Sequence, residues 1–219
     1  MDTKAIVFDA YGTLFDVNSA AEKCKDKIGD KWEAFANFWR TTQLEYTWLR
    51  SLMKRHKDFW KITEDSLDKS MNVFSIDMSM KNDLLNLYKV LSPYPEVKEV
   101  LENLKKKNFK LSILSNGTPA LLNELVKSND LNNLFDDLFS VEEVKIYKPD
   151  SKVYDLPIKK YQIKPLEVTF LSANTWDVSG GGNYGYNAVW VNRNKSKFDN
   201  LDYHPKNEIN NLTQLLDIV

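Results

Sequence analysis

Residues 5–14 have the sequence AIVFDAYGTL, and this segment is the strongest indication of a fold in the chain. Ala5–Phe8 is a short, continuous apolar run that stops at Asp9, and Gly12 follows as a turn signal. Continuous apolar runs are typical of strands that are buried on both faces of a parallel sheet. We therefore predict a buried strand with Asp9 at its carboxyl end, which is the usual location of chemistry in such a sheet.

The rest of the chain predicts helices first and then an alternation of strands and helices. From about Asn18 to Val90 the apolar residues recur at helical spacing, and Pro93 and Pro95 end this region. The elements predicted after the prolines are a helix at Val97–Lys107, a strand at Phe109–Leu114, a helix at Ala120–Lys127, a strand at Leu138–Ser140, a helix at Ser151–Tyr161, strands at Val168–Leu171 and Ala188–Val191, and a closing helix at Asn207–Val219. This order predicts an α/β fold with a parallel sheet flanked by helices. We place its core in residues 1–16 and 93–219, and an inserted helical subdomain in residues 17–92.

The composition excludes several classes of partner. Lys and Arg total 30 against 31 for Asp and Glu, so the net charge of −1 provides no field that attracts nucleic acid. The apolar runs are far shorter than the roughly 18 residues that span a bilayer, and no signal peptide is visible at the N-terminus. Cys24 is the only cysteine, and His56 and His204 are the only histidines, which excludes a disulfide framework and a three-histidine zinc site. We expect a soluble, cytoplasmic protein that binds neither nucleic acid nor membranes.

Polar side chains follow the predicted strands at four points along the chain. They are Asp9 with Tyr11 and Thr13, Ser115 with Asn116, Lys148 within Tyr147–Pro149, and Ser172 with Asn174 and Asp177. Because the carboxyl ends of parallel strands converge on one crevice, we expect these groups to form one site. Each group alone has a structural explanation, such as a turn at Asp9 or a helix cap at Asp177. Together they suit covalent catalysis by an aspartate that Lys148 keeps ionised.

One glycine pattern has the spacing of a nucleotide-binding motif but the wrong sequence context. Gly180, Gly182 and Gly185 have the spacing of the dinucleotide-binding fingerprint, which normally follows a strand and opens a helix. Here the glycines lead into the apolar strand Ala188–Val191. We therefore predict a turn at this position and no nucleotide.

The four polar segments resemble, in order, the four motifs of the haloacid dehalogenase superfamily. These segments are Asp9–Leu14, Ser115–Gly117, Lys148–Pro149 and Ser172–Asp177. Within the helical region, Phe38–Arg40 and Gln43–Met53 are similar to the cap-helix signature of the L-2-haloacid dehalogenase branch. The resemblance covers almost the whole chain and implies a Rossmann-like core with a helical cap, as well as a homodimer.

Two differences from the phosphatases of this superfamily bear on the reaction. Those enzymes usually carry a second aspartate two residues after the nucleophile, where this chain has Tyr11. Their magnesium site uses acidic residues of the fourth motif, which here offers Ser172, Asn174 and the single carboxylate of Asp177. One carboxylate is fewer than a hard dication usually binds, so we expect no metal and no cofactor. Asp9 together with Asp177 does not exclude a weak metal site.

The resemblance also implies a reaction and a role for each residue. Asp9 attacks C2 of a short L-2-haloacid, halide departs, and water then cleaves the resulting ester to give a D-2-hydroxy acid. Ser115 and Asn116 hold the substrate carboxylate, and Arg40 and Asn116 face the departing halide. The residues that orient Asp9 and the water are Lys148 and Asp177, supported by Thr13, Ser172, Asn174 and Tyr154, while those that line the substrate pocket are Tyr11, Leu44, Phe59 and Trp176.

The sequence leaves two other functions possible. A magnesium-dependent phosphatase of the same superfamily acting on a small phosphate ester is distinguished by its need for magnesium. A binding module that has lost its chemistry is distinguished by unchanged ligand affinity in Asp9→Asn.

Overall fold

The computed structural model describes residues 3–219, and a six-stranded parallel sheet forms its centre. The strand order is β3-β2-β1-β4-β5-β6, and the strands are β1 Ala5–Phe8, β2 Lys110–Ser115, β3 Asp137–Ser140, β4 Val168–Ser172, β5 Asn187–Val191 and β6 Asn207–Ile209. Strand β1 lies between β2 and β4, with Phe8 opposite Ile113 and Leu171. All four residues of β1 are buried, as the continuous apolar run predicts.

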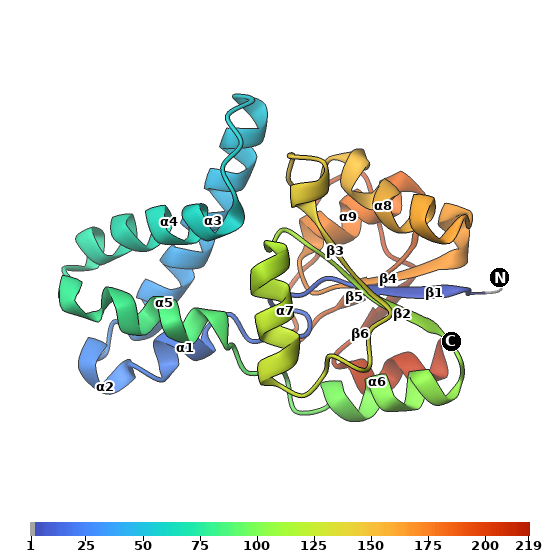
Figure 1. Cartoon of the computed structure of the whole chain (residues 1–219), viewed down its shortest axis with the longest axis horizontal. Helices are drawn as coiled ribbons and strands as arrows, with labels where there is room; N and C mark the ends of the chain where they lie inside the picture. The colour runs from blue at the N-terminus through green and yellow to red at the C-terminus, as the bar shows by residue number, and fades with distance from the viewer. Residues whose placement is uncertain (1–2) are drawn as a thin grey trace.

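Four helices flank the sheet. They are α6 Val97–Lys106, α7 Pro119–Ser128, α8 Ser151–Tyr161 and α9 Thr175–Tyr184. Figure 1 shows α8 and α9 together on one face and α6 on the opposite face. Helix α6 buries the apolar stripe of Val97, Val100, Leu101 and Leu104 that its spacing predicts. The α/β fold predicted from the sequence is confirmed.

The chain between β1 and α6 is largely helical. It contains α1 Ser19–Glu22, α2 Lys25–Ile28, α3 Trp32–Leu52, α4 Phe59–Phe74 and α5 Lys81–Lys89. Helices α3 and α4 pack against each other, and the indole of Trp39 donates a hydrogen bond to the carbonyl of Thr63 at 3.1 Å. Figure 1 shows these helices beyond the end toward which β1 runs, so the carboxyl ends of the strands face them. Within residues 3–219, no helix is both long and apolar enough to cross a membrane.

The C-terminal segment differs from its prediction as a closing helix at Asn207–Val219. Residues Asn207–Ile209 form β6, which pairs with the otherwise open edge of β5, and a 3₁₀ helix follows at Leu212–Asp217. Leu212 and Leu215 are three residues apart, and residues at this spacing share one face of a 3₁₀ helix. Both side chains are buried, so the apolar pattern is satisfied without an α-helix.

The glycine-rich segment also differs from its prediction as a turn. Gly180 and Gly182 lie inside helix α9, and only Gly185, with φ +114°, ends it. A Cβ atom on Gly180 would lie 2.5 Å from the Tyr154 hydroxyl, and one on Gly181 would lie 2.7 Å from the Phe170 ring. The glycines therefore let α9 lie close to α8 and β4, and this packing outweighs their low helix propensity.

Candidate active site

The carboxylate of Asp9 is the centre of the candidate site. It is buried at the end of β1, where the Asp9 backbone N–H donates to the carbonyl of Leu171. Gly12 has φ +89°, which a glycine adopts without strain, and the chain then folds back so that Leu14 N–H donates to the Ala10 carbonyl. This tight loop brings the hydroxyl of Thr13 to 2.9 Å from Asp9 Oδ2.

Three more side chains donate hydrogen bonds to the Asp9 carboxylate. Asn174 Nδ2 lies 2.9 Å from Oδ2, Lys148 Nζ lies 3.1 Å from Oδ1, and the hydroxyl of Ser172 makes a longer contact of 3.4 Å to Oδ2. The donors come from three separate segments of the chain, and together they fix the orientation of the carboxylate. The structure thus brings these predicted residues together around Asp9.

Lys148 lies between two carboxylates. Its ammonium group is fully buried and reaches Asp177 Oδ2 at 2.9 Å as well as Asp9. Burial acts to lower the pKa of Lys148, but Asp177 and Asp9 outweigh burial and raise the pKa above its usual value. The two carboxylates therefore stabilise the charged form of Lys148.

Asp177 is the second carboxylate that contacts Lys148. It is fully buried, and its Oδ1 accepts a hydrogen bond of 2.7 Å from the Tyr154 hydroxyl. Burial raises the pKa of Asp177, Lys148 lowers it, Asp9 raises it, and the result is a pKa of about 6. Shifted carboxyl groups of this kind are frequent at functional sites.

Ser115 and Asn116 lie beside Lys148 at the end of β2. The amide oxygen of Asn116 accepts a hydrogen bond of 3.1 Å from the backbone N–H of Lys148, and Ser115 Oγ accepts one of 3.0 Å from Gly117 N–H. Both side chains are buried. Asn116 is thus connected to Asp9 through Lys148, whereas the hydrogen bond of Ser115 lies within its own loop.

Arg40 reaches the site from helix α3. Its Nη2 lies 3.4 Å from the carbonyl oxygen of Tyr11, and its Nη1 donates to Gln43 Oε1 at 2.9 Å. Gln43 Nε2 in turn donates to Thr63 Oγ1 at 2.7 Å and to the Tyr88 hydroxyl at 3.0 Å. This buried network holds the guanidinium in place. The sequence reasoning assigned no role to Gln43 or Tyr88, although the spacing of three residues between Arg40 and Gln43 is a usable signal.

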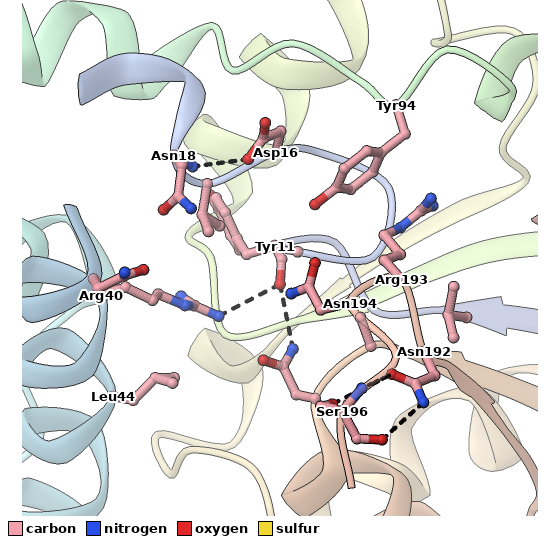
Figure 2. A pocket seen from close by; sticks show the side chains of 16 residues that line it. Tyr11, Asp16, Asn18, Arg40, Leu44, Tyr94, Asn192, Arg193, Asn194 and Ser196 are labelled. Carbon is pink, nitrogen blue, oxygen red and sulfur yellow. Dashed lines mark hydrogen bonds between the residues drawn. The ribbon is translucent and has the colours of Figure 1, made fainter. Parts of the chain in front are cut away.

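A polar cavity of about 390 Å³ lies beside the cluster. Its lining residues include Arg40 and Leu44 of α3, Tyr11 of the loop after β1, and Asn174, which also donates to Asp9. Figure 2 shows Arg40 directed at the backbone oxygen of Tyr11. The same oxygen accepts a hydrogen bond of 3.3 Å from Asn174 Nδ2. The cavity therefore ends at residues that are in contact with the loop that follows Asp9.

Two predicted pocket residues lie elsewhere. Phe59 is fully buried and packs behind Tyr11, with ring centroids 5.3 Å apart, rather than lining this cavity. Trp176 lines a second cavity of about 450 Å³, which Lys148 also lines, and its ring packs edge-on against Trp48. Of the three apolar residues expected at the substrate pocket, Leu44 lines the first cavity, Trp176 lines the second and Phe59 lines neither.

The donor set does not fit a divalent metal ion. Asp9 and Asp177 both use both carboxylate oxygens as acceptors for donors of the protein, and the Lys148 ammonium occupies the space between them. Among residues 3–219, no group of three or more His, Cys, Asp or Glu side chains converges. A dication would have to displace Lys148 or repel it, so we derive no step through a metal.

Comparisons with known proteins agree with this geometry. A model of the haloacid dehalogenase-like hydrolases matches residues 3–185. The (S)-2-haloacid dehalogenase 4A of Burkholderia cepacia is 38% identical over 97% of this chain and 93% of its own, and (S)-2-haloacid dehalogenase 1 of Pseudomonas sp. strain CBS-3 is 43% identical over 87% and 85%. The structure of L-2-haloacid dehalogenase from Xanthobacter autotrophicus with chloropropionic acid covalently bound has a TM-score of 0.92 and 32% identity, and it covers 99% of this chain and 98% of that one. The chain therefore belongs to the haloacid dehalogenase-like hydrolases, in the branch of the L-2-haloacid dehalogenases.

Proposed function

We propose that this protein hydrolyses the carbon–halogen bond of short L-2-haloacids to give D-2-hydroxy acids and halide. The observation that supports the proposal is the buried Asp9 carboxylate. Four side chains, one of which is Lys148, donate hydrogen bonds to this carboxylate and hold it in one orientation. A fixed, desolvated carboxylate is suited to act as a nucleophile. The names of the relatives at 32–43% identity support the same reaction.

In the first step an oxygen of Asp9 forms a bond to C2, and the C2–halogen bond breaks with its electron pair on the halide. Attack from the face opposite the halogen inverts C2. In the second step water attacks the carbonyl carbon of the ester, which releases the hydroxy acid and restores the Asp9 carboxylate. The net reaction consumes one water and releases one halide ion and one proton.

The surrounding residues have separate roles in this proposal. Ser115 and Asn116 bind the substrate carboxylate, and Arg40 with Asn116 stabilises the charge that develops on the halide. Lys148 and Asp177 orient Asp9 and the hydrolytic water, and residues 17–92 act as a cap over a core of residues 1–16 and 93–219. The homodimer and the cytoplasmic location belong to this proposal as expectations from the family.

The phosphatase alternative has less support from the site. A phosphatase needs an acid near Asp9 that protonates the leaving alcohol, and Tyr11 occupies that position. Burial raises the pKa of Tyr11 well above its usual value, so its phenol is a poor proton donor at neutral pH. The donor set around Asp9 also disfavours magnesium.

The enantiomers of 2-chloropropionate test the proposed function. Purified protein in EDTA is expected to release chloride from the L enantiomer and not from the D enantiomer, because only one face of C2 is presented to Asp9. Ion chromatography of chloride and chiral analysis of lactate give the two readouts. Magnesium-dependent release of phosphate from a phosphate ester, without chloride, would replace the proposal with the phosphatase.

The raised pKa of Asp177 predicts that kcat falls at acid pH. Below pH 6 Asp177 takes up a proton and no longer holds Lys148 as a carboxylate, so kcat is expected to fall up to tenfold per pH unit. The hydrogen bond from Tyr154 lowers the pKa of Asp177, so Tyr154→Phe is expected to move this fall in kcat to higher pH. Tyr161→Phe, on the same helix but distant from Asp177, is the matched control. A kcat that stays constant from pH 7 to pH 5 would contradict this role of Asp177.

A further inference from the structure

Arg193 holds the loop that follows Asp9, although it touches none of the groups that react. It comes two residues after β5, and its side chain is only 12% exposed. Its Nη2 donates a hydrogen bond of 2.8 Å to the backbone carbonyl of Thr13, 180 residues earlier in the chain. Its Nη1 forms an ion pair of 2.7 Å with Glu96 Oε1. A planar guanidinium can make both bonds at once in a fixed geometry.

Tyr94 holds the next residue of the same loop. The backbone N–H of Tyr94 donates to the carbonyl of Leu14 at 3.0 Å. The guanidinium carbon of Arg193 lies 3.6 Å from the centre of the Tyr94 ring, and Figure 2 shows the two side chains together at the edge of the cavity. Two successive carbonyls, those of Thr13 and Leu14, are thus fixed by two residues that stack on each other.

The position of Arg193 is itself fixed. Burial acts to raise the pKa of Glu96, but the hydrogen bond and positive charge of Arg193, together with hydrogen bonds from backbone N–H groups, outweigh burial and hold the pKa below its usual value. Glu96 Oε1 also accepts a hydrogen bond of 3.3 Å from the backbone N–H of Leu212. Glu96 is therefore an ionised anchor for the guanidinium.

Thr13 connects this anchor to the nucleophile. Its hydroxyl donates to Asp9 Oδ2 at 2.9 Å and accepts a hydrogen bond of 2.8 Å from Ala173 N–H. A displaced Thr13 carbonyl would move this hydroxyl, and the Asp9 carboxylate would lose one of its orienting donors. We infer that Arg193 is a positioning residue for the proposed dehalogenation, which acts through Thr13 to hold Asp9 in the attacking orientation. The inference rests on the proposed function.

The expected effect is on kcat rather than on KM. Arg193→Gln removes the charge and the second donor, and kcat on L-2-chloropropionate is expected to fall on the order of 10- to 100-fold, since small misplacements of reacting groups have effects of this size. KM is expected to change less than about threefold, because the proposed substrate-binding residues Ser115, Asn116 and Arg40 are untouched. Arg193→Lys retains the charge and is expected to lose less activity than Arg193→Gln.

Chemical rescue separates positioning from a general loss of structure. The cavity of about 390 Å³ is lined by Arg193 and gives an added guanidinium ion access to the space that the side chain leaves. In Arg193→Ala, millimolar guanidinium or methylguanidinium chloride is expected to raise kcat several-fold, with sodium chloride at the same concentration as the salt control. The wild type and the exposed-site control Arg55→Gln are expected to show full activity and no rescue.

A destabilised control completes the test. Leu215→Ala removes a buried side chain of the C-terminal 3₁₀ helix and is expected to lower Tm while kcat at 25 °C stays at the wild-type value. Equal losses of kcat in Leu215→Ala and Arg193→Gln, wild-type kcat in Arg193→Gln, or a loss confined to KM would each overturn the role of Arg193. A wild type that releases no halide would overturn the proposed function itself, and this role with it.

Discussion

Asp9→Asn is expected to abolish halide release from L-2-chloropropionate, with kcat reduced about 10³-fold or more. The substitution keeps the size of the side chain but removes the negatively charged oxygen that forms the bond to C2, and loss of a covalent nucleophile has effects of this size or larger. The amide N–H₂ of asparagine would also face hydrogen-bond donors instead of acceptors, because Lys148, Thr13 and Asn174 all donate to this position. Chloride release in single and multiple turnovers measures the effect.

The exposed Asp26→Asn in helix α2 is the matched control and is expected to retain wild-type kcat. The folded state of Asp9→Asn is checked by its thermal transition. Activity of Asp9→Asn within tenfold of the wild type would remove Asp9 from the reaction. Unchanged binding of the substrate with no turnover in either protein would favour the binding-module alternative.

Lys148→Met is expected to lower both activity and stability. The variant leaves Asp9 and Asp177 facing each other without the ammonium that lies 3.1 Å and 2.9 Å from them. Loss of one preorganised charged donor costs about 10²- to 10³-fold in kcat. Removal of one partner from a buried ion pair costs about 3–5 kcal/mol in the free energy of unfolding. Urea denaturation and chloride release measure the two effects.

The loss of stability is expected to depend on pH in a defined direction. Lys148 lowers the pKa of Asp177, so the variant raises this pKa further above its value in the unfolded chain. A carboxyl group with a raised pKa binds more protons in the folded state, and the folded state therefore gains stability as the pH falls. The destabilisation by Lys148→Met is expected to be smaller at pH 5 than at pH 8.

Lys145→Met, three residues away and on the surface, is the matched control. It removes an exposed ion pair with Glu142, which is worth little, and we expect changes below about 1 kcal/mol. A Lys148→Met protein with the stability and kcat of this control would contradict the assigned role of Lys148.

The strands could be predicted because their sequence patterns are local. The burial of Ala5–Phe8 on both faces leaves a continuous apolar run. Strands β2 and β5 are buried at every residue after their first, and their predicted bounds agree with the observed bounds to within one residue. Strand β6 could not be predicted, because its three residues are ordered by pairing with the edge of β5 rather than by a pattern of their own. The helix over Gly180–Gly182 escaped prediction for a related reason, since close contacts with Tyr154 and Phe170 stabilise it.

Some residues of the candidate site could be predicted from the sequence and others could not. Asp9, Lys148 and Asp177 could be recognised as a group because the polar segments that contain them converge at the carboxyl edge of the sheet. Arg193 acts through a contact with a distant segment that no local spacing encodes. Gln43 has a local signal in its helical spacing from Arg40, but its bond to Thr63 on the next helix has none. The displacement of Phe59 from the cavity wall depends on the packing of the helical segment against Tyr11, which the sequence alone does not fix.

A single turnover in ¹⁸O-water tests the ester on Asp9 most directly. With enzyme in excess over L-2-chloropropionate, water attacks the carbonyl carbon of the ester, so the ¹⁸O enters the Asp9 carboxylate and the hydroxyl of D-lactate retains ¹⁶O. Mass spectrometry of the lactate and of the peptide that contains Asp9 gives both readouts. Lactate labelled in the first turnover, with an unlabelled Asp9 peptide, would show that water attacks C2 directly and would contradict the covalent mechanism.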